Sequence, residues 1–152
     1  MKPTDGYILY SVGKEYQLTR DTIFRLIYIR PGTDIKLGPI SLSTAGILAI
    51  RRYYTWDGPS GPTKLLRRVL NGLFPIKRFM RGALAHDALY QLMRNNLLPA
   101  SLRDAADREL INICEQDGMS AARRWWVYRG LRLGGADSVL SENKQREYRA
   151  PF

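Results

Sequence analysis

A proline- and glycine-rich segment near the middle of the chain separates two halves of different character. Residues 56–63 (WDGPSGPT) contain two prolines and two glycines, which fix a sharp backbone path and exclude regular structure. The residues before this segment have strand-like patterns, and those after it have helix-like patterns. We therefore expect an α+β fold, with an N-terminal, mostly antiparallel β-sheet followed by a C-terminal bundle of about four helices.

The first half contains several strand signals. Residues 7–12 and 15–19, joined by a Gly-Lys turn, have the pattern of a β-hairpin. Residues 22–30 are dense in β-branched and aromatic side chains and end at a Pro-Gly turn pair. A further strand is expected over residues 46–54. No helix-length connection separates these segments, so neighbouring strands are expected to pair antiparallel.

Four helices are expected in the second half. Ser101 is the expected N-cap of the third helix, which Gly118 ends, and Ser120 is the expected N-cap of the fourth. The polar tail, residues 141–152, is expected to be loosely held, which leaves residues 1–140 as one domain. The expected helical ranges are 63–73, 76–95, 101–118 and 121–133.

The single cysteine, Cys114, excludes an intramolecular disulfide and a cysteine-based zinc site. A reducing compartment is therefore expected. Charged residues interrupt the apolar runs near the start, so no signal peptide is expected. No stretch approaches the roughly 20 apolar residues of a membrane span, and we expect a cytoplasmic protein.

The charge balance favours an anionic partner. The chain has 24 Lys and Arg against 14 Asp and Glu, a formal charge of +10, which suits nucleic acid, a membrane surface or an acidic protein. Residues 121–132 interleave arginines with aromatic residues, a mixture that can stack bases and contact phosphate. The same pattern is typical of an amphipathic helix whose Trp and Tyr pack inward while its arginines stay in water. We favour this packing interpretation.

An unusual group of polar residues lies in the expected helices. His86, the only histidine, is followed by Asp87 in a helix that is apolar almost all round, and such a helix is expected to be central and buried. His86 and Tyr90 share a face at i, i+4 spacing. Asp107 lies at the edge of the buried face of the next helix. Charged groups are seldom buried without a partner, so both aspartates require an explanation.

Two kinds of chemistry fit these residues. Asp57, His86, Asp87 and Asp107 form a plausible oxygen-rich metal set with one imidazole, which suits Mg²⁺ or Mn²⁺ best and is compatible with zinc or iron. Without a metal, Asp87 or Asp107 could orient His86 as a general base, with Ser60 as the nucleophile.

A structural interpretation of the same residues remains open. Asp57 can cap its own Gly-Pro turn, and Asp87 can pair with a nearby arginine. Asp107 can pair with an arginine of the last helix, such as Arg123 or Arg124. A single histidine on an apolar helix is more often a structural group than a ligand.

Three short motifs in series carry a resemblance to a known family. They are residues 57–62 (DGPSGP), residues 86–90 (HDALY) and the pair Ala106-Asp107, followed by a helix that ends in glycine. In this order and spacing, over residues 45–135, they resemble a family of small phage and prophage proteins that is classed only as a domain of unknown function. The resemblance implies a phage or prophage origin, and with it a location in the host cytoplasm or the virion.

Two functions follow as expectations. The first is a small hydrolase-like phage protein that uses the Asp/His cluster, with or without one divalent metal (Mg, Mn or Zn). The second is a non-enzymatic phage interaction protein, a virion component or a host-target binder, whose Asp/His cluster is a structural polar core. Its arginine- and lysine-rich surface would contact an acidic protein or nucleic acid.

Overall fold

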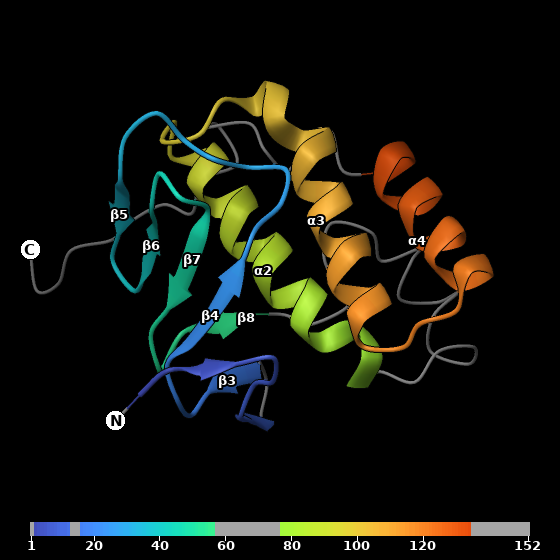
Figure 1. Ribbon diagram of the computed structural model, residues 1–152, viewed down its shortest axis with the longest axis horizontal. Helices are drawn as coiled ribbons and strands as arrows, with labels where there is room; N and C mark the ends of the chain where they lie inside the picture. The colour runs from blue at the N-terminus through green and yellow to red at the C-terminus, as the bar shows by residue number, and fades with distance from the viewer. Residues whose placement is uncertain (1, 13–15, 57–76, 135–152) are drawn as a thin grey trace, which may run out of the picture.

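The computed structural model describes residues 2–12, 16–56 and 77–134. As Figure 1 shows, the strands gather on one side of the molecule and the helices lie in succession beside them, first α2, then α3, then α4. The strands are β1 (Thr4–Asp5), β2 (Tyr10–Val12), β3 (Tyr16–Leu18), β4 (Thr22–Arg25), β5 (Ile35–Leu37), β6 (Ile40–Leu42), β7 (Ile47–Ile50) and β8 (Thr55–Trp56). The α-helices are α2 (Lys77–Arg94), α3 (Arg103–Gln116) and α4 (Ala121–Gly134), with a 3₁₀ turn, η2 (Ala100–Leu102), before α3.

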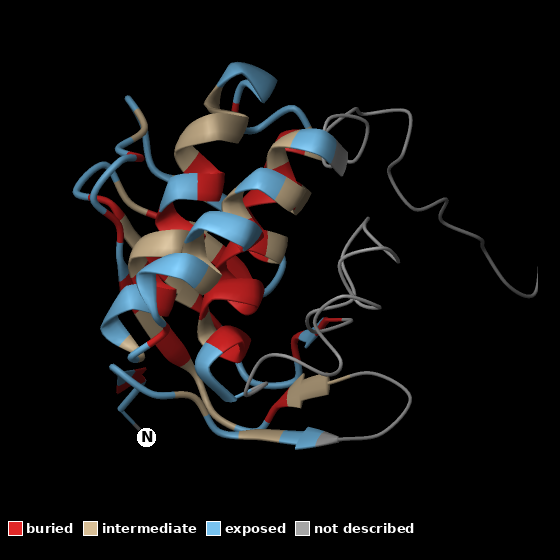
Figure 2. Ribbon diagram, turned by 90° about the vertical axis from the view of Figure 1, so that its right-hand side faces the viewer, coloured by how far each residue is buried: buried red, intermediate tan, exposed pale blue. Residues whose placement is uncertain are grey.

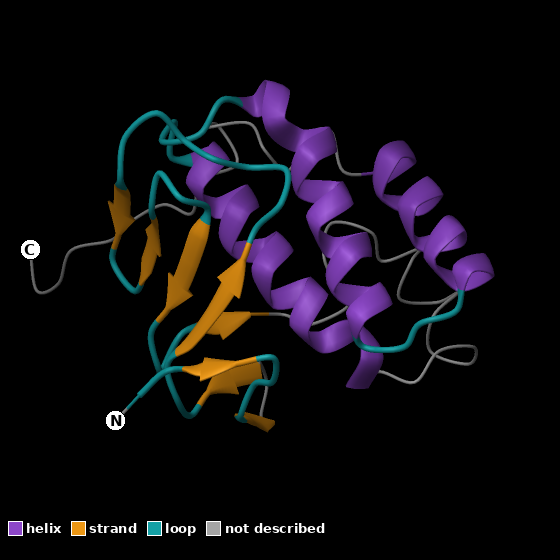
Figure 3. Ribbon diagram, in the orientation of Figure 1, coloured by secondary structure: helices purple, strands orange, loops and turns teal. Residues whose placement is uncertain are grey.

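The strands form two sheets, one of five strands in the order β1-β4-β7-β6-β5 and one of three in the order β2-β3-β8. Every pairing is antiparallel except that of β1 with β4. The expected α+β class with a mostly antiparallel N-terminal sheet is therefore confirmed, as is the hairpin of β2 and β3 (Figure 3).

The alternating pattern of the central strands decides which face of the larger sheet is buried. In β7 and β6, every second residue is buried, because successive side chains of a strand point to opposite faces. These side chains pack against the apolar face of α2 in one core. A second cluster joins α2, α3 and α4, so α2 contributes to both. Figure 2 shows the buried residues on the inner faces of the helices.

Helix α2 is as buried as its composition predicts, with twelve buried residues among eighteen. It approaches α3 closely at Gly82, where an added Cβ would lie 3.0 Å from Cys114 Sγ and 3.1 Å from the backbone oxygen of Leu110. Both helices are thus held near enough for their polar side chains to meet.

Several element boundaries differ from expectation. The expected strand over residues 22–30 ends at Arg25, and the one over 46–54 ends at Ile50. The β5–β6 hairpin was not predicted. Ser101 lies inside η2 and does not cap α3, whose N-terminus has no side-chain cap.

The helix count and the packing of α4 also differ. The described residues contain three α-helices where about four were expected, and the expected helix 63–73 lies outside them, as does the tail 141–152. The prediction that the tryptophans of α4 pack inward is wrong for Trp125 and Trp126, which are 53% and 61% exposed. Val127 and Leu131 pack inward instead, because they are the residues of α4 that face α2 and α3.

Candidate functional site

Three polar side chains, two from α2 and one from α4, meet the carboxylate of Asp107 on α3. On α2, His86 Nε2 lies 2.7 Å from Asp107 Oδ1, and the Tyr90 hydroxyl donates to the same oxygen at 2.5 Å. From α4, Arg132 Nη1 donates to Asp107 Oδ2 at 3.1 Å. We call His86, Tyr90, Asp107 and Arg132 the Asp107 cluster. Because a carboxylate only accepts, Nε2 carries the proton of the His86–Asp107 hydrogen bond.

The cluster lies inside the helical layer. Asp107 is 0% exposed and His86 is 6% exposed, and the rings of His86 and Tyr90 are in contact, tilted by 39° with centroids 3.9 Å apart. A buried carboxylate is costly unless it is paired and hydrogen-bonded. Here both oxygens have partners, so the polar group is satisfied inside the core.

The electrostatics of Asp107 follow from two opposing effects. Burial raises the pKa of its carboxyl, but the hydrogen bond and charge of His86, with hydrogen bonds from Tyr90 and Arg132, outweigh burial and hold the pKa below its usual range. Burial, followed by the charge of Asp107, raises the pKa of the Tyr90 hydroxyl far above its usual value. Asp107 is therefore the anion of the cluster and Tyr90 a neutral donor.

The second aspartate of the sequence prediction is elsewhere. Asp87 Oδ2 accepts from the Tyr54 hydroxyl at 2.7 Å, and that hydroxyl lies 3.0 Å from Gln91 Oε1. Consecutive residues of a helix point about 100° apart, so His86 faces α3 while Asp87 faces the segment before β8. The structure thus brings His86 and Asp107 together and places Asp87 in a different network.

The two loop residues of the prediction, Asp57 and Ser60, lie outside the described residues. Within residues 2–12, 16–56 and 77–134, no group of three or more His, Cys, Asp or Glu side chains is arranged to hold a metal ion. The surroundings of Asp107 also do not suit a cation. The positively charged Arg132 donates to Oδ2, and His86 and Tyr90 donate to Oδ1.

The sequence predicted that an arginine of the last helix can pair with Asp107, but not which arginine does so. An arginine of the last helix does pair with Asp107, but it is Arg132 and not Arg123 or Arg124. Arg124 instead pairs with Glu115, with Nη2 lying 3.6 Å from Oε1. The i+4 spacing of His86 and Tyr90 indicated their common face, whereas no local pattern singled out Arg132.

Glu109 is a buried polar residue that the sequence did not reveal. Its Oε1 accepts from the backbone N–H groups of Ile27, Tyr28 and Ile29, which ties the loop after β4 to α3. Burial raises the pKa of Glu109, and the three backbone hydrogen bonds oppose this shift. Glu109 therefore connects the sheet region to the helices through these hydrogen bonds.

The cysteine does not add a nucleophile to the site. Cys114 is buried on α3, and burial raises the pKa of its thiol to about 12. The reactive thiolate is therefore scarce at neutral pH.

Comparison with known proteins gives no family assignment. No family model matches the chain. Searches of curated proteins and of solved structures also found no significant match. No helix in the described part of the chain has the length and apolar character needed to cross a membrane.

Proposed function

We propose that this chain is a basic phage or prophage interaction protein, a virion component or host-target binder, in which the Asp107 cluster is a structural polar core. The observation that carries the proposal is the complete burial of Asp107 together with the satisfaction of both its oxygens by three donors. A carboxylate that is closed to solvent and accepts hydrogen bonds at both oxygens is not open to a substrate, and its net effect is to fix how three helices pack. The phage assignment rests on the three serial motifs.

The test compares stability and metal content in the same samples. Asp107→Asn keeps the shape of the side chain but removes the charged acceptor of His86, Tyr90 and Arg132, and a hydrogen bond to a charged group contributes about 1.5–3 kcal/mol. We expect urea denaturation to show a loss of this size. Asp5→Asn is the control, because the ion pair of Asp5 with Arg25 is exposed and far from the cluster in sequence, and exposed pairs contribute about 1 kcal/mol or less.

Protein purified without a metal-binding tag or chelator is assayed for metal in parallel. Near-stoichiometric metal in the wild type that Asp107→Asn loses, without the loss of stability, would contradict a structural role.

A second candidate is the small hydrolase-like function, and one observation favours it. With the proton of His86 held on Nε2 by Asp107, Nδ1 is the basic nitrogen of the neutral ring, which is the arrangement of an oriented general base. In this reading Ser60 is the nucleophile and Asp107 a positioning residue. Asp87, in its separate network with Tyr54, does not orient His86 in the described geometry.

Labelling with a fluorophosphonate reagent separates the two candidates, because such reagents react with a serine that a neighbouring base activates. Labelling that disappears in both Ser60→Ala and His86→Gln would favour the hydrolase. The interaction protein is expected to remain unlabelled, and its only histidine should react with diethyl pyrocarbonate only as the protein unfolds.

A further inference from the structure

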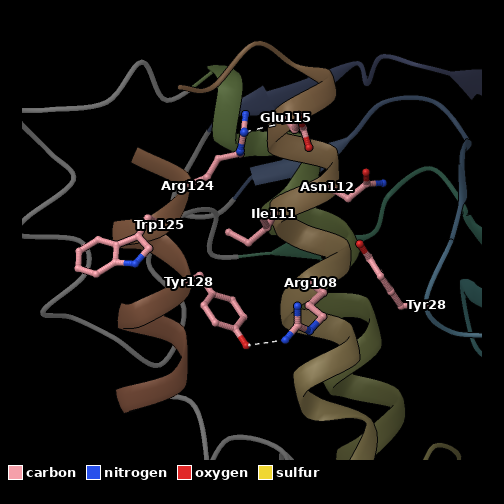
Figure 4. A pocket seen from close by; sticks show the side chains of 8 residues that line it. All are labelled: Tyr28, Arg108, Ile111, Asn112, Glu115, Arg124, Trp125 and Tyr128. Atoms are coloured by element: carbon pink, nitrogen blue, oxygen red, sulfur yellow. Dashed lines mark hydrogen bonds and ion pairs between the residues drawn. The ribbon is translucent and has the colours of Figure 1, made fainter. Parts of the chain in front are cut away.

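A groove between α3 and α4 combines aromatic rings with arginines. It has a volume of about 270 Å³ and is lined from both helices and by Tyr28, from the loop after β4. Figure 4 shows Arg108 and Ile111 of α3 facing Tyr128 of α4 across it, while Trp125 extends from α4 on the side away from α3. The groove is separate from the Asp107 cluster, since none of the four cluster residues lines it.

Polar contacts bridge the groove at both ends. At one end, Arg124 Nη2 lies 3.6 Å from Glu115 Oε1. At the other, Arg108 Nη2 lies 3.4 Å from the Tyr128 hydroxyl (Figure 4). That hydroxyl also donates to Asp104 Oδ1 at 2.6 Å. The apolar packing of Val127 and Leu131 in the cluster shared with α3 and α2 holds the helices together independently of these contacts, so the groove is formed before any partner binds.

The aromatic rings along this groove are open to solvent. Trp125 is 53% exposed and Tyr28 is 50% exposed, although large apolar side chains usually gain free energy by burial. The guanidinium carbon of Arg129 lies 5.3 Å from the centroid of the Trp125 ring. That of Arg108 lies 5.5 Å from the centroid of the Tyr128 ring. Exposed rings beside arginines form a surface on which a planar, anionic ligand can stack.

The charge of the last helix is complementary to such a ligand. Helix α4 contains four arginines and no acidic residue. The partners of Arg108 and Arg124 are the half-exposed carboxylates of Asp104 and Glu115. Exposed ion pairs contribute little to stability, so the exposed Arg108 can exchange its carboxylate for a phosphate at small cost. Arg124 is more covered and also donates from Nη1 to the Met119 backbone oxygen at 2.7 Å, which leaves Nη2 on the side of Glu115.

We propose that this groove binds single-stranded nucleic acid, with bases stacked on Trp125 and Tyr28 and phosphates contacted by Arg108, Arg124 and Arg129. The inference rests on the proposed interaction function and names its partner. Every base has a face that can stack on an aromatic ring, while arginines follow the backbone. An acidic protein would use the arginines but leave the rings unexplained. A duplex would offer phosphates but no unstacked base.

Fluorescence anisotropy of the full-length protein with a labelled oligothymidylate of about 12 nucleotides tests the proposal. We expect binding at about 50 mM salt that weakens steeply towards 200 mM, because phosphate contacts release counterions. Unlabelled oligothymidylate should compete better than a duplex of the same length or poly-L-glutamate.

Two aromatic variants test the groove itself. Trp125→Ala is expected to weaken binding about tenfold or more, since it removes one stacking ring. Tyr53→Ala is the matched control, because Tyr53 is also exposed and has an arginine, Arg52, over its ring, but does not line the groove. It should change affinity by about twofold or less. Both side chains are exposed, so both variants should retain the wild-type circular dichroism spectrum.

Three results would overturn the proposal: no binding of oligothymidylate at low salt, equal competition by duplex or poly-L-glutamate, or equal effects of Trp125→Ala and Tyr53→Ala. Equal competition by poly-L-glutamate would indicate an acidic protein partner. Failure of the proposed function would be visible separately, as metal or fluorophosphonate labelling that depends on His86 and Asp107.

Discussion

Asp107 makes the stability of the protein depend on pH. Its pKa is lower in the folded state than in an unfolded chain, because hydrogen bonds and charge from its neighbours outweigh burial. Its contribution is therefore present above the ordinary carboxyl pKa, near 4, and is lost as the pH falls through the folded pKa. We expect the unfolding free energy of the wild type to fall more steeply below about pH 5 than that of Asp107→Asn.

Urea denaturation at a series of pH values measures this difference. Asp5→Asn serves as the control, since Asp5 forms an exposed ion pair with Arg25 and its replacement should preserve the steep fall. Parallel pH profiles for the wild type and Asp107→Asn would show that the carboxylate of Asp107 is not stabilised by its partners.

Glu109 fixes the loop after β4 by a single oxygen. Its replacement in Glu109→Ala leaves the backbone N–H groups of Ile27, Tyr28 and Ile29 without this acceptor, and each unsatisfied buried donor costs about 1–3 kcal/mol. We expect a loss of about 2–4 kcal/mol in total, because part of the loop gains access to water. Hydrogen exchange of these three amides should become much faster in the variant.

The matched variant Glu109→Gln keeps a carbonyl oxygen that can accept the same hydrogen bonds. It should retain most of the amide protection. Equal exchange in the alanine variant and the wild type would mean that Glu109 does not hold this loop.

At the scale of elements, the contact between α2 and α3 depends on Gly82. Glycine to alanine in an exposed helix gains about 1 kcal/mol from helix propensity. Here the new Cβ would meet Cys114 Sγ at 3.0 Å and the Leu110 backbone oxygen at 3.1 Å, and overpacking costs about 1–3 kcal/mol. We expect Gly82→Ala to destabilise the protein, measured as a lower urea midpoint.

The double variant Gly82→Ala with Cys114→Ala removes the sulfur contact but not the backbone contact. Gly82→Ala should therefore lower the unfolding free energy less in the Cys114→Ala protein than in the wild type. A more stable Gly82→Ala protein would show that the helices can separate without cost.

At the scale of the whole molecule, α2 joins the sheet side and the helical side. It contributes to the core shared with the strands and to the cluster shared with α3 and α4. We therefore expect one cooperative unfolding transition for the described domain. In a Trp125→Phe, Trp126→Phe variant, buried Trp56 is the remaining tryptophan. Its fluorescence reports on the sheet, while far-ultraviolet circular dichroism reports mainly on the helices.

Coincident urea midpoints from the two signals would agree with this expectation. A sheet signal that changes before the helical signal would mean that the two sides unfold independently. The wild type gives the control for any effect of the two substitutions.

Much of the fold could be read from local patterns in the sequence. β-branched and aromatic residues indicated the strands within residues 7–30, and the nearly continuous apolar surface of the helix expected over residues 76–95 predicted that it is central and buried, because these features depend only on neighbouring residues. The hairpin of β2 and β3 followed from its short turn. The end of β4 at Arg25 did not, because Glu109, more than 80 positions away, captures the backbone that would otherwise extend the strand.

The candidate site divides in the same way. The sequence by itself determined that His86 and Tyr90 share a face and that Asp107 needs a partner, since helical spacing and the cost of a buried charge are local matters. Only the tertiary structure decided that Asp87 turns away from them and that Arg132 supplies the partner. It also decided that the tryptophans of α4 stay in solvent. The reason is physical: the rotation of each helix is set by the packing of its whole apolar surface against its neighbours, and that packing is not encoded in any single segment.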